Sequence, residues 1–310
     1  MKVVVVTDPH VTAPGQSVHG MDTNARFSLC IETINEIAGD ADLCVVMGDL
    51  VDDGSSMAYA EFRRRAELLN MPVRLLLGNH DNRANFFAAN PNVLPDENGF
   101  AQGSVELENV LLLFLDTHNP AANSGDYHPV KLDWLKRKLA AEPKRPAYIF
   151  MHHPPFDTGF YIDHSKVVES EALLKTLVEA GGVRHVFVGH THRASSGHFG
   201  GISWTALHGL ANENDFELRP AKPNYRSGPA QIGILLIEHA RSVLHFHDLL
   251  QPYPLIAYSG KSTRQPGPEF TASEDLSGCR HKCRVQPRKG TCSCAQRQTS
   301  HHRSYPAGKY

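Results

Sequence analysis

Five short segments of the 310-residue chain bring together aspartate, asparagine and histidine side chains that could bind metal ions. In chain order they are Asp8-Pro9-His10, Gly48-Asp49, Gly78-Asn79-His80-Asp81, His152-His153-Pro154-Pro155 and Gly189-His190-Thr191-His192. Two Asp, one Asn and four His of these segments form a mixed oxygen and nitrogen ligand set. Such a set suits Mn, Fe or Zn and is poor for Ca²⁺. Each segment alone is a weak signal, but five in one chain predict a metal site.

A pair of divalent ions would give this site a defined chemistry. Two metal ions ~3.5–4 Å apart lower the pKa of a water towards ~7 and contact both the attacking and the leaving oxygen. With one bridging carboxylate and a metal-bound hydroxide, the centre keeps a charge of about +1, which matches a phosphodiester monoanion. We therefore predict phosphoryl chemistry by direct attack of that hydroxide. Consistent with this, the chain has no Gly-x-Ser-x-Gly elbow and no Walker loop.

Each of the five segments follows a short apolar run that predicts a buried β-strand. The runs are Val3–Thr7, Leu43–Met47, Val73–Leu77, Ala147–Met151 and His185–Val188. Residues at the carboxyl ends of strands in an open sheet converge on one crevice. A glycine before a ligand lets the backbone turn sharply as the strand ends. We therefore expect the five segments to meet at one site.

The remaining apolar patterns predict the layers around these strands. Helical spacing predicts helices at Thr23–Ala38, Tyr59–Leu69, Lys131–Leu139 and Glu169–Ala180. Further strands are expected at Gly103–Leu107, Val110–Leu115, Ser203–Leu207, Ile232–Glu238 and Val243–Asp248. An α/β order that closes with strands alone predicts two sheets packed face to face with helices outside.

As a set, the five segments resemble the calcineurin-like metallophosphoesterases, over about residues 1–250. Within that superfamily the chain is most similar to the bacterial class III phosphodiesterases, which include 3′,5′-cyclic-nucleotide and glycerophosphodiester enzymes. The segments His19-Gly20-x-Asp22-x-Asn24 and Phe150–Pro155 carry this closer similarity. The resemblance implies an α/β fold, a four-layer α-β-β-α sandwich of two mixed sheets flanked by helices.

The resemblance also implies a role for each ligand. One metal ion would be held by Asp8, His10 and His192. The other would be held by Asn79, His152 and His190, and Asp49 would bridge the two. The ions would be Mn and/or Fe, with Zn and Co as alternatives. His153 would lie behind the ligands or serve only the fold.

The resemblance places His80 against the substrate, where it would stabilise the transition state or protonate the leaving alkoxide. Asp52 is expected to orient His80, and the alternative for both residues is a solvated loop position. Candidates for substrate contact, chosen by position near the ligand segments, are His19, Asn24, His118, His208 and Asn212.

One departure from the superfamily bears on the substrate. Ser/Thr protein phosphatases carry Gly-Asp-x-Val-Asp-Arg-Gly, whose arginine binds a monoester dianion, but here Asp53 stands in the place of that arginine. An acid at this position would repel a dianion. We therefore predict hydrolysis of small phosphodiesters, either 3′,5′-cyclic nucleotides such as cAMP or glycerophosphodiesters. The alternatives are a phosphomonoesterase and a non-catalytic scaffold with the same fold.

Charge and hydropathy exclude several other classes of partner. The first 260 residues carry a net charge of −9 without a basic stripe, so we expect no binding of long nucleic acid. No apolar run approaches the ~18 residues of a membrane span, and the N-terminus lacks the apolar region of a signal peptide. We expect a cytoplasmic protein without membrane contact. The resemblance implies a homo-oligomer, a dimer or larger.

The last fifty residues differ in composition from the rest. They carry a net charge of +7 and only three residues of the Leu, Ile, Val and Phe class, too few for a core. We therefore predict a catalytic domain at 1–258 and a basic tail at 259–310, for which disorder is the favoured interpretation. The alternatives are a shifted reading frame and a zinc site. The cysteine spacing fits no common zinc motif; the cysteines are Cys279, Cys283, Cys292 and Cys294.

Overall fold

The fold was obtained as a computed structural model, which describes residues 1–107, 109–143, 145–216, 224–238 and 241–251. The predicted tail at 259–310, with its four cysteines, and the boundary at 258 lie outside these residues.

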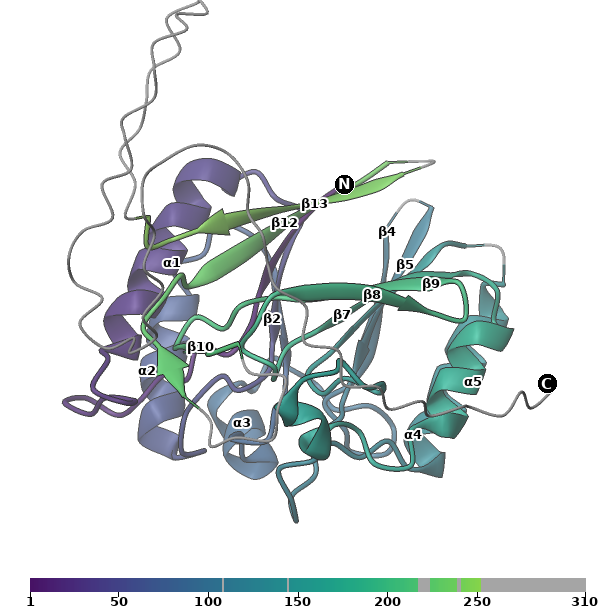
Figure 1. The fold of residues 1–310 in the computed structure, drawn as a ribbon, viewed down its shortest axis with the longest axis horizontal. Helices are drawn as coiled ribbons and strands as arrows, with labels where there is room; N and C mark the ends of the chain where they lie inside the picture. Colours follow the sequence, from purple (N-terminus) through teal and green to yellow (C-terminus); the bar gives the residue numbers. More distant parts are fainter. Residues whose placement is uncertain (108, 144, 217–223, 239–240, 252–310) are drawn as a thin grey trace, which may run out of the picture. The chain divides into compact units, whose positions relative to one another are not determined.

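The first sheet has five strands in the order β13-β12-β1-β2-β3 (Figure 1). Their bounds are β1 Lys2–Val6, β2 Leu43–Met47, β3 Val73–Leu76, β12 Gln231–Ile237 and β13 Ser242–Asp248. Strands β1, β2 and β3 run parallel, whereas β12 is antiparallel to both of its neighbours. Three helices pack on its outer face and share a core with it: α1 Thr23–Ala38, α2 Ser56–Ala66 and α3 Arg83–Ala89.

The second sheet has six strands in the order β4-β5-β6-β7-β9-β8. Their bounds are β4 Gly103–Leu107, β5 Val110–Leu115, β6 Ala147–Met151, β7 Val183–Val188, β8 Ser195–Phe199 and β9 Ile202–Ala206. Helices α4 (Pro129–Ala141) and α5 (Glu171–Glu179) cover its outer face. Three short elements complete the described chain: the 3₁₀ helix η1 Tyr161–Ser165 and the paired strands β10 Glu213–Asn214 and β11 Tyr225–Arg226.

A separate apolar core lies between the two sheets and explains the continuous β-branched run at the N-terminus. Val3 and Val5 point into this inner core, whereas Val4 and Val6 face the helices. Because successive side chains of a strand alternate between faces, a strand buried on both faces must be apolar at every position. The architecture is therefore the expected four-layer α-β-β-α sandwich of two mixed sheets.

The expected strands and helices are confirmed, with shifts of a few residues at some ends. The helix predicted from Tyr59 begins at Ser56, because the Ser55 side chain caps it by accepting the N–H of Ala58 at 3.2 Å. Helix α3 and the elements η1, β8, β10 and β11 were not predicted, since each is too short or too polar for its periodicity to stand out. No helix in the described residues is long and apolar enough to cross a membrane.

A buried ionic network follows β5 and ties two helices to the second sheet. The fully buried carboxylate of Asp116 accepts hydrogen bonds from the Arg83 guanidinium, with Nη2 2.9 Å from each oxygen. The residue Lys131 is 1% exposed, and its Nζ lies 3.9 Å from Asp116 Oδ1. Burial lowers the pKa of Lys131, and the negative charge of Asp116 opposes this effect. Asp116 is therefore shared by two cations, and Lys131 Nζ also lies 3.7 Å from the partly exposed Asp126 carboxylate.

We predict that Asp116→Ala lowers the free energy of unfolding by about 3–5 kcal/mol, because Arg83 loses its carboxylate partner and the buried Lys131 keeps only the partly exposed Asp126. Urea unfolding followed by circular dichroism measures the change. The control is Glu106→Ala, which removes the partner of Arg145 at an exposed position and should cost under about 1 kcal/mol. Equal effects for the two variants would contradict the assigned role of Asp116.

Candidate metal centre and substrate pocket

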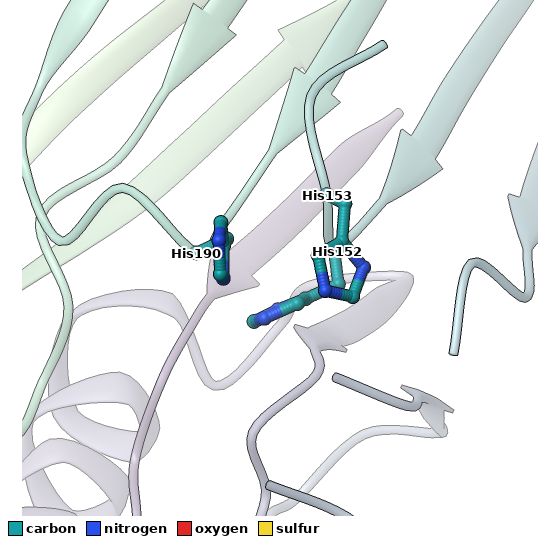
Figure 2. A group of neighbouring side chains, drawn as sticks. All are labelled: His152, His153 and His190. Atoms are coloured by element: carbon teal, nitrogen blue, oxygen red, sulfur yellow. The ribbon is translucent and has the colours of Figure 1, made fainter. Parts of the chain in front are cut away.

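The structure brings all seven of the expected metal ligands to one end of the two sheets. Ligand atoms of Asp8, His10, Asp49 and His192 lie within 4.8 Å of one another. A second group joins His152 and His190 with the neighbouring His153, at the ends of the adjacent strands β6 and β7 (Figure 2). The last expected ligand, Asn79, has its Oδ1 3.3 Å from His152 Nε2. The strand-end segments therefore converge as expected.

Five of these residues have an unusual backbone conformation. Their φ angles are positive: Asp8 53°, His10 44°, Asp49 47°, His190 65° and His192 47°. Residues other than glycine rarely occupy this left-handed region, and each such position costs on the order of 1–3 kcal/mol. The turns after β1, β2 and β7 are thus made in part by the ligands themselves, whereas Asn79 after β3 and His152 after β6 do not have a positive φ.

The glycines that precede the ligands have two different functions. Gly48 makes a turn of its own with a φ of 94°, as the sequence predicted. Gly78 does not have a positive φ, but a Cβ on it would lie 2.2 Å from Asp49 Oδ1. Glycine is therefore required at 78 by the close approach of the two loops.

The buried carboxylates of the cluster need positive charge beside them. Asp8 and Asp49 are at most 1% exposed. Burial raises the pKa of each carboxyl, yet His192 beside Asp8 and His152 beside Asp49 outweigh it and hold both pKa values below the ordinary range. Burial lowers the pKa of His152, but the Asp49 and Asp8 carboxylates raise it overall to about 9. Two buried carboxylates therefore require cations beside them.

Three imidazoles are oriented so that their Nε2 atoms point into the cluster. Each donates its Nδ1–H to an acceptor outside: His10 to Asp52 Oδ1 at 3.0 Å, His152 to the Met47 carbonyl at 2.9 Å and His192 to the Asn212 carbonyl at 3.1 Å. This is the arrangement that fixes the tautomer of a metal-binding histidine.

Several lone pairs consequently face one another. His10 Nε2 lies 3.2 Å from His192 Nε2, and both need a cation or proton between them. Asp49 Oδ2 lies 3.5 Å from His10 Nε2 and 3.3 Å from His152 Nε2, between the two groups of ligands. Within the described chain, the buried Nε2 of His190 has no hydrogen-bond partner. Burial lowers the pKa of His190 to about 3, which keeps this nitrogen neutral and able to bind a metal. The donor set therefore fits two divalent cations.

His153 is held apart from this role by its own hydrogen bonds. Its Nδ1 accepts from the Thr117 hydroxyl at 2.9 Å, and its Nε2–H donates to the Asn123 carbonyl at 3.1 Å. Burial and the neighbouring His152 hold the pKa of His153 well below its usual value. With both nitrogens in use, His153 positions the Asn123 loop, in agreement with the structural role considered from the sequence.

His80 and Asp52 lie at the edge of the cluster, and both line the pocket. The His80 ring is 41% exposed, packs edge-on against His10 at 4.6 Å, and donates Nδ1–H to the Asp52 carbonyl at 2.7 Å. The Asp52 carboxylate is instead hydrogen-bonded to His10. Asp52 thus orients His80 through its backbone and His10 through its side chain, a division that the sequence could not reveal.

A buried carboxylate connects the loop after β2 with the loop after β3. Asp81 Oδ2 accepts from the N–H of Leu50 at 3.2 Å and of Gly78 at 2.9 Å, and Oδ1 accepts from the Tyr59 hydroxyl at 2.8 Å. Burial and the nearby Asp49 carboxylate raise the pKa of Asp81 to about 7. Because Leu50 follows Asp49 and Gly78 precedes Asn79, this carboxylate fixes the relative position of two expected ligands.

A pocket of about 370 Å³ opens above the cluster. Of the five candidates for substrate contact, His19 and Asn212 line it. The other three lie outside this lining: Asn24 bonds the backbone of Thr12, His118 donates to the Gly78 carbonyl at 2.9 Å, and the buried Nδ1 of His208 lies 3.8 Å from Glu213 Oε1, beyond hydrogen-bond distance. Proximity to the ligand segments in the sequence therefore identified only some of the residues that line the pocket.

Other wall residues were not predicted, because proximity to the ligand segments in sequence does not indicate which side chains face the pocket. They are Val18, Asn123, Tyr161, Ile162, His164, Ser165, Asn214 and Tyr225. Conversely, Asp53 is exposed and outside this lining, and its carboxylate accepts the N–H of Ser55 at 3.0 Å. The expected repulsion between Asp53 and a substrate dianion therefore has no direct contact to act through.

The comparisons with known proteins agree with this geometry. Residues 1–194 match the family described as calcineurin-like phosphoesterase. A probable cyclic nucleotide phosphodiesterase of Rhodopseudomonas palustris is 36% identical over 222 residues, which cover 70% of this chain and 81% of that protein. A probable glycerophosphodiester phosphodiesterase of Arcobacter nitrofigilis is 29% identical over 63% of this chain and 73% of its own length.

Among solved structures, a dimetal phosphatase from Danio rerio superposes with a TM-score of 0.63 at 12% identity. The match covers 81% of this chain and 97% of that one. At this identity the likeness concerns the fold, which is the same arrangement of two sheets between helices.

We predict that Tyr59→Phe weakens metal binding by about tenfold. The variant removes the hydrogen bond from the Tyr59 hydroxyl to Asp81, the carboxylate that connects the two loops carrying ligands. Elemental analysis after dialysis against graded metal concentrations measures the affinity. Tyr148→Phe is the matched control, since Tyr148 is buried between the sheets away from the ligands. Unchanged affinity in the Tyr59 variant would contradict the proposed positioning.

Proposed function

The chain belongs to the calcineurin-like phosphoesterase family, and we propose that it hydrolyses small phosphodiesters at this cluster. The candidate substrates are 3′,5′-cyclic nucleotides and glycerophosphodiesters, the two substrate classes for which its relatives are named. The family and the buried Asp and His clusters identify the chain as a binuclear-metal phosphoesterase. The preference for a diester over a monoester has to be argued from the residues that line the pocket.

The observation that carries this preference is the charge of the pocket wall. Among the residues that the structure describes, none that lines the pocket is a lysine or arginine. Recognition of a monoester dianion typically uses an arginine that forms paired hydrogen bonds with the phosphate. A diester monoanion has one charge fewer and a second ester group, which uncharged walls accommodate. The wall therefore favours a diester over a monoester.

The expected ligands divide into two sets around Asp49. We propose that Asp8, His10 and His192 hold one divalent cation and that Asn79, His152 and His190 hold the other. Cations bound there would lower the pKa of a water and neutralise charge on the phosphoryl oxygens. Mn or Fe remains the predicted identity, with Zn and Co as alternatives. The homo-oligomer and the cytoplasmic location also stay predictions of the sequence.

His80 is the proposed general acid. With its Nδ1–H held by the Asp52 carbonyl, the ring is fixed at the edge of the pocket and its other nitrogen is available to a leaving oxygen. When hydroxide oxygen bonds to phosphorus and the bond from phosphorus to the ester oxygen breaks, the Nε2 proton of a protonated His80 ring would pass to the departing alkoxide and give an alcohol, and solvent would return the proton to the neutral ring. Proton transfer of this kind contributes ~10²–10⁴-fold to a rate.

We predict that the purified protein with Mn²⁺ hydrolyses bis(p-nitrophenyl) phosphate and 3′,5′-cAMP or glycerophosphocholine, and that Asp49→Ala abolishes both activity and tight metal binding. Release of p-nitrophenol, product chromatography and elemental analysis are the measurements. Asp53→Ala is the matched control: it removes a nearby carboxylate outside the pocket and should leave diester hydrolysis unchanged. Faster turnover of monoesters than of every diester, or full activity in Asp49→Ala, would contradict the proposal.

We further predict that His80→Ala slows hydrolysis of an alkyl diester by ~10²–10⁴-fold and that of bis(p-nitrophenyl) phosphate far less. The nitrophenolate departs without protonation, so it needs little help from an acid. The same change at His198, which is exposed on β8, should alter neither rate. An equal loss on both substrates would show that His80 does not act as the acid.

A further inference from the structure

The mouth of the pocket carries aromatic rings that the proposed chemistry does not use. His19 comes from the loop after β1, Tyr161 from η1 and Tyr225 from β11, and all three line the same pocket as the metal cluster. None belongs to the expected ligand set. Three segments far apart in the sequence thus place aromatic side chains at one opening.

Two of these rings form a flat surface. His19 and Tyr225 stack with centroids 4.2 Å apart and planes 19° from parallel. His19 adopts a positive φ of 49°, an uncommon conformation for a residue other than glycine, and Tyr225 remains 45% exposed. An exposed aromatic ring at a pocket mouth, stacked on a second ring, leaves apolar surface available to a bound molecule.

Tyr161 is held rigidly by the loop that carries it. The Asp163 carboxylate accepts hydrogen bonds from the Thr158 hydroxyl at 2.6 Å and from the N–H groups of Thr158 and Gly159, each at 2.9 Å. The buried Phe160 ring packs edge-on against Tyr161 at 4.6 Å. Burial and the nearby Tyr225 raise the pKa of Tyr161 to about 12, so its phenol remains neutral. The ring is therefore preorganised.

The charged side chains near the rings, and the orientation of the rings, indicate which chemical group of a substrate would bind there. The carboxylates among the described lining residues are Asp49, which is itself an expected ligand, and Asp52, which is grouped with the ligand His10. A choline cation is held by rings at several angles around it or by a carboxylate, whereas the His19 and Tyr225 rings are nearly parallel. Parallel rings present a flat face, which suits a flat partner. Base stacking on such rings is sequence-tolerant and substantial.

We propose that His19, Tyr161 and Tyr225 form an aromatic rim that stacks on a nucleobase, so that the site selects phosphodiesters of nucleosides over those of glycerol. The inference rests on the proposed diesterase function. Phosphate at the cluster and base at the mouth would occupy the two ends of one pocket. The three residues act as specificity determinants and take no part in the proton transfer.

Tyr225→Leu and Tyr225→Phe, compared with the intact holoenzyme, test the rim. Leucine removes the ring, whereas phenylalanine keeps it and removes only the hydroxyl. We expect Tyr225→Leu to raise KM for 3′,5′-cAMP about tenfold or more. The kinetic constants for glycerophosphocholine and glycerophosphoglycerol should change less than about twofold. Tyr225→Phe should behave as the wild type on all three substrates, and so should Phe246→Leu, which changes an exposed ring on β13 outside the pocket lining.

A binding measurement gives a second readout that does not depend on turnover. Adenosine 5′-monophosphate and ribose 5-phosphate differ only in the base, and calorimetry with the Mn²⁺-loaded protein compares their affinities. We expect tighter binding of the nucleotide, with the difference lost in Tyr225→Leu and kept in Tyr225→Phe.

The outcomes separate this inference from the proposed function. Diester hydrolysis in which Tyr225→Leu affects all three substrates equally would overturn the rim and leave the diesterase intact. A loss confined to glycerophosphocholine would overturn it in favour of a choline site. If the wild type hydrolyses no diester, the proposed function is wrong. The affinities for adenosine 5′-monophosphate and ribose 5-phosphate then still decide whether the rings bind a base.

Discussion

The burial of two carboxylates in one cluster is the constraint on which the rest of the site depends. Asp8 and Asp49 are removed from water, and an uncompensated charge in such a place costs several kcal/mol. Hydrogen bonds from backbone N–H groups reach them, from His190 to Asp8 and from His80 to Asp49, but no lysine or arginine of the described chain is paired with either. The surrounding imidazoles direct lone pairs inward. Protonated imidazoles such as His152 or bound divalent cations can balance this charge, and the buried Asp and His donor groups fit the cations.

The second constraint is the strain of the backbone that carries these ligands. Asp8, His10 and His192 are among the residues held in the left-handed region, where a free chain would seldom place them. The two sheets fix the strand ends, and a buried carboxylate, Asp81, joins two of the following loops. Stability from the apolar cores thus offsets local strain at the site. The helices and sheets serve the function by keeping the ligands in a geometry that they would not adopt alone.

Much of the fold and most of the cluster could be predicted because their signals are local. A β-branched run such as Val3–Val6 predicts a doubly buried strand, and a ligand directly after it must lie at the strand end. The remainder depends on contacts between distant segments. Nothing near His118 indicates that it donates to the carbonyl of Gly78, forty residues earlier in the chain. Tyr225 reaches the pocket only because β11 pairs with β10, two strands of two residues each, too short to predict.

The same contrast explains how one cluster can serve more than one substrate class. The floor of the pocket is built from residues that follow strands of the two sheets, so a change there disturbs metal binding and the packing of those strands. The mouth is built from η1, the β10–β11 pair and the loop around His19, which contribute little to any core. Substitutions at the mouth can alter which ester group fits without altering the reaction beneath it. Relatives named for cyclic nucleotides and for glycerophosphodiesters are therefore compatible with one reaction at the cluster and with different residues at the mouth.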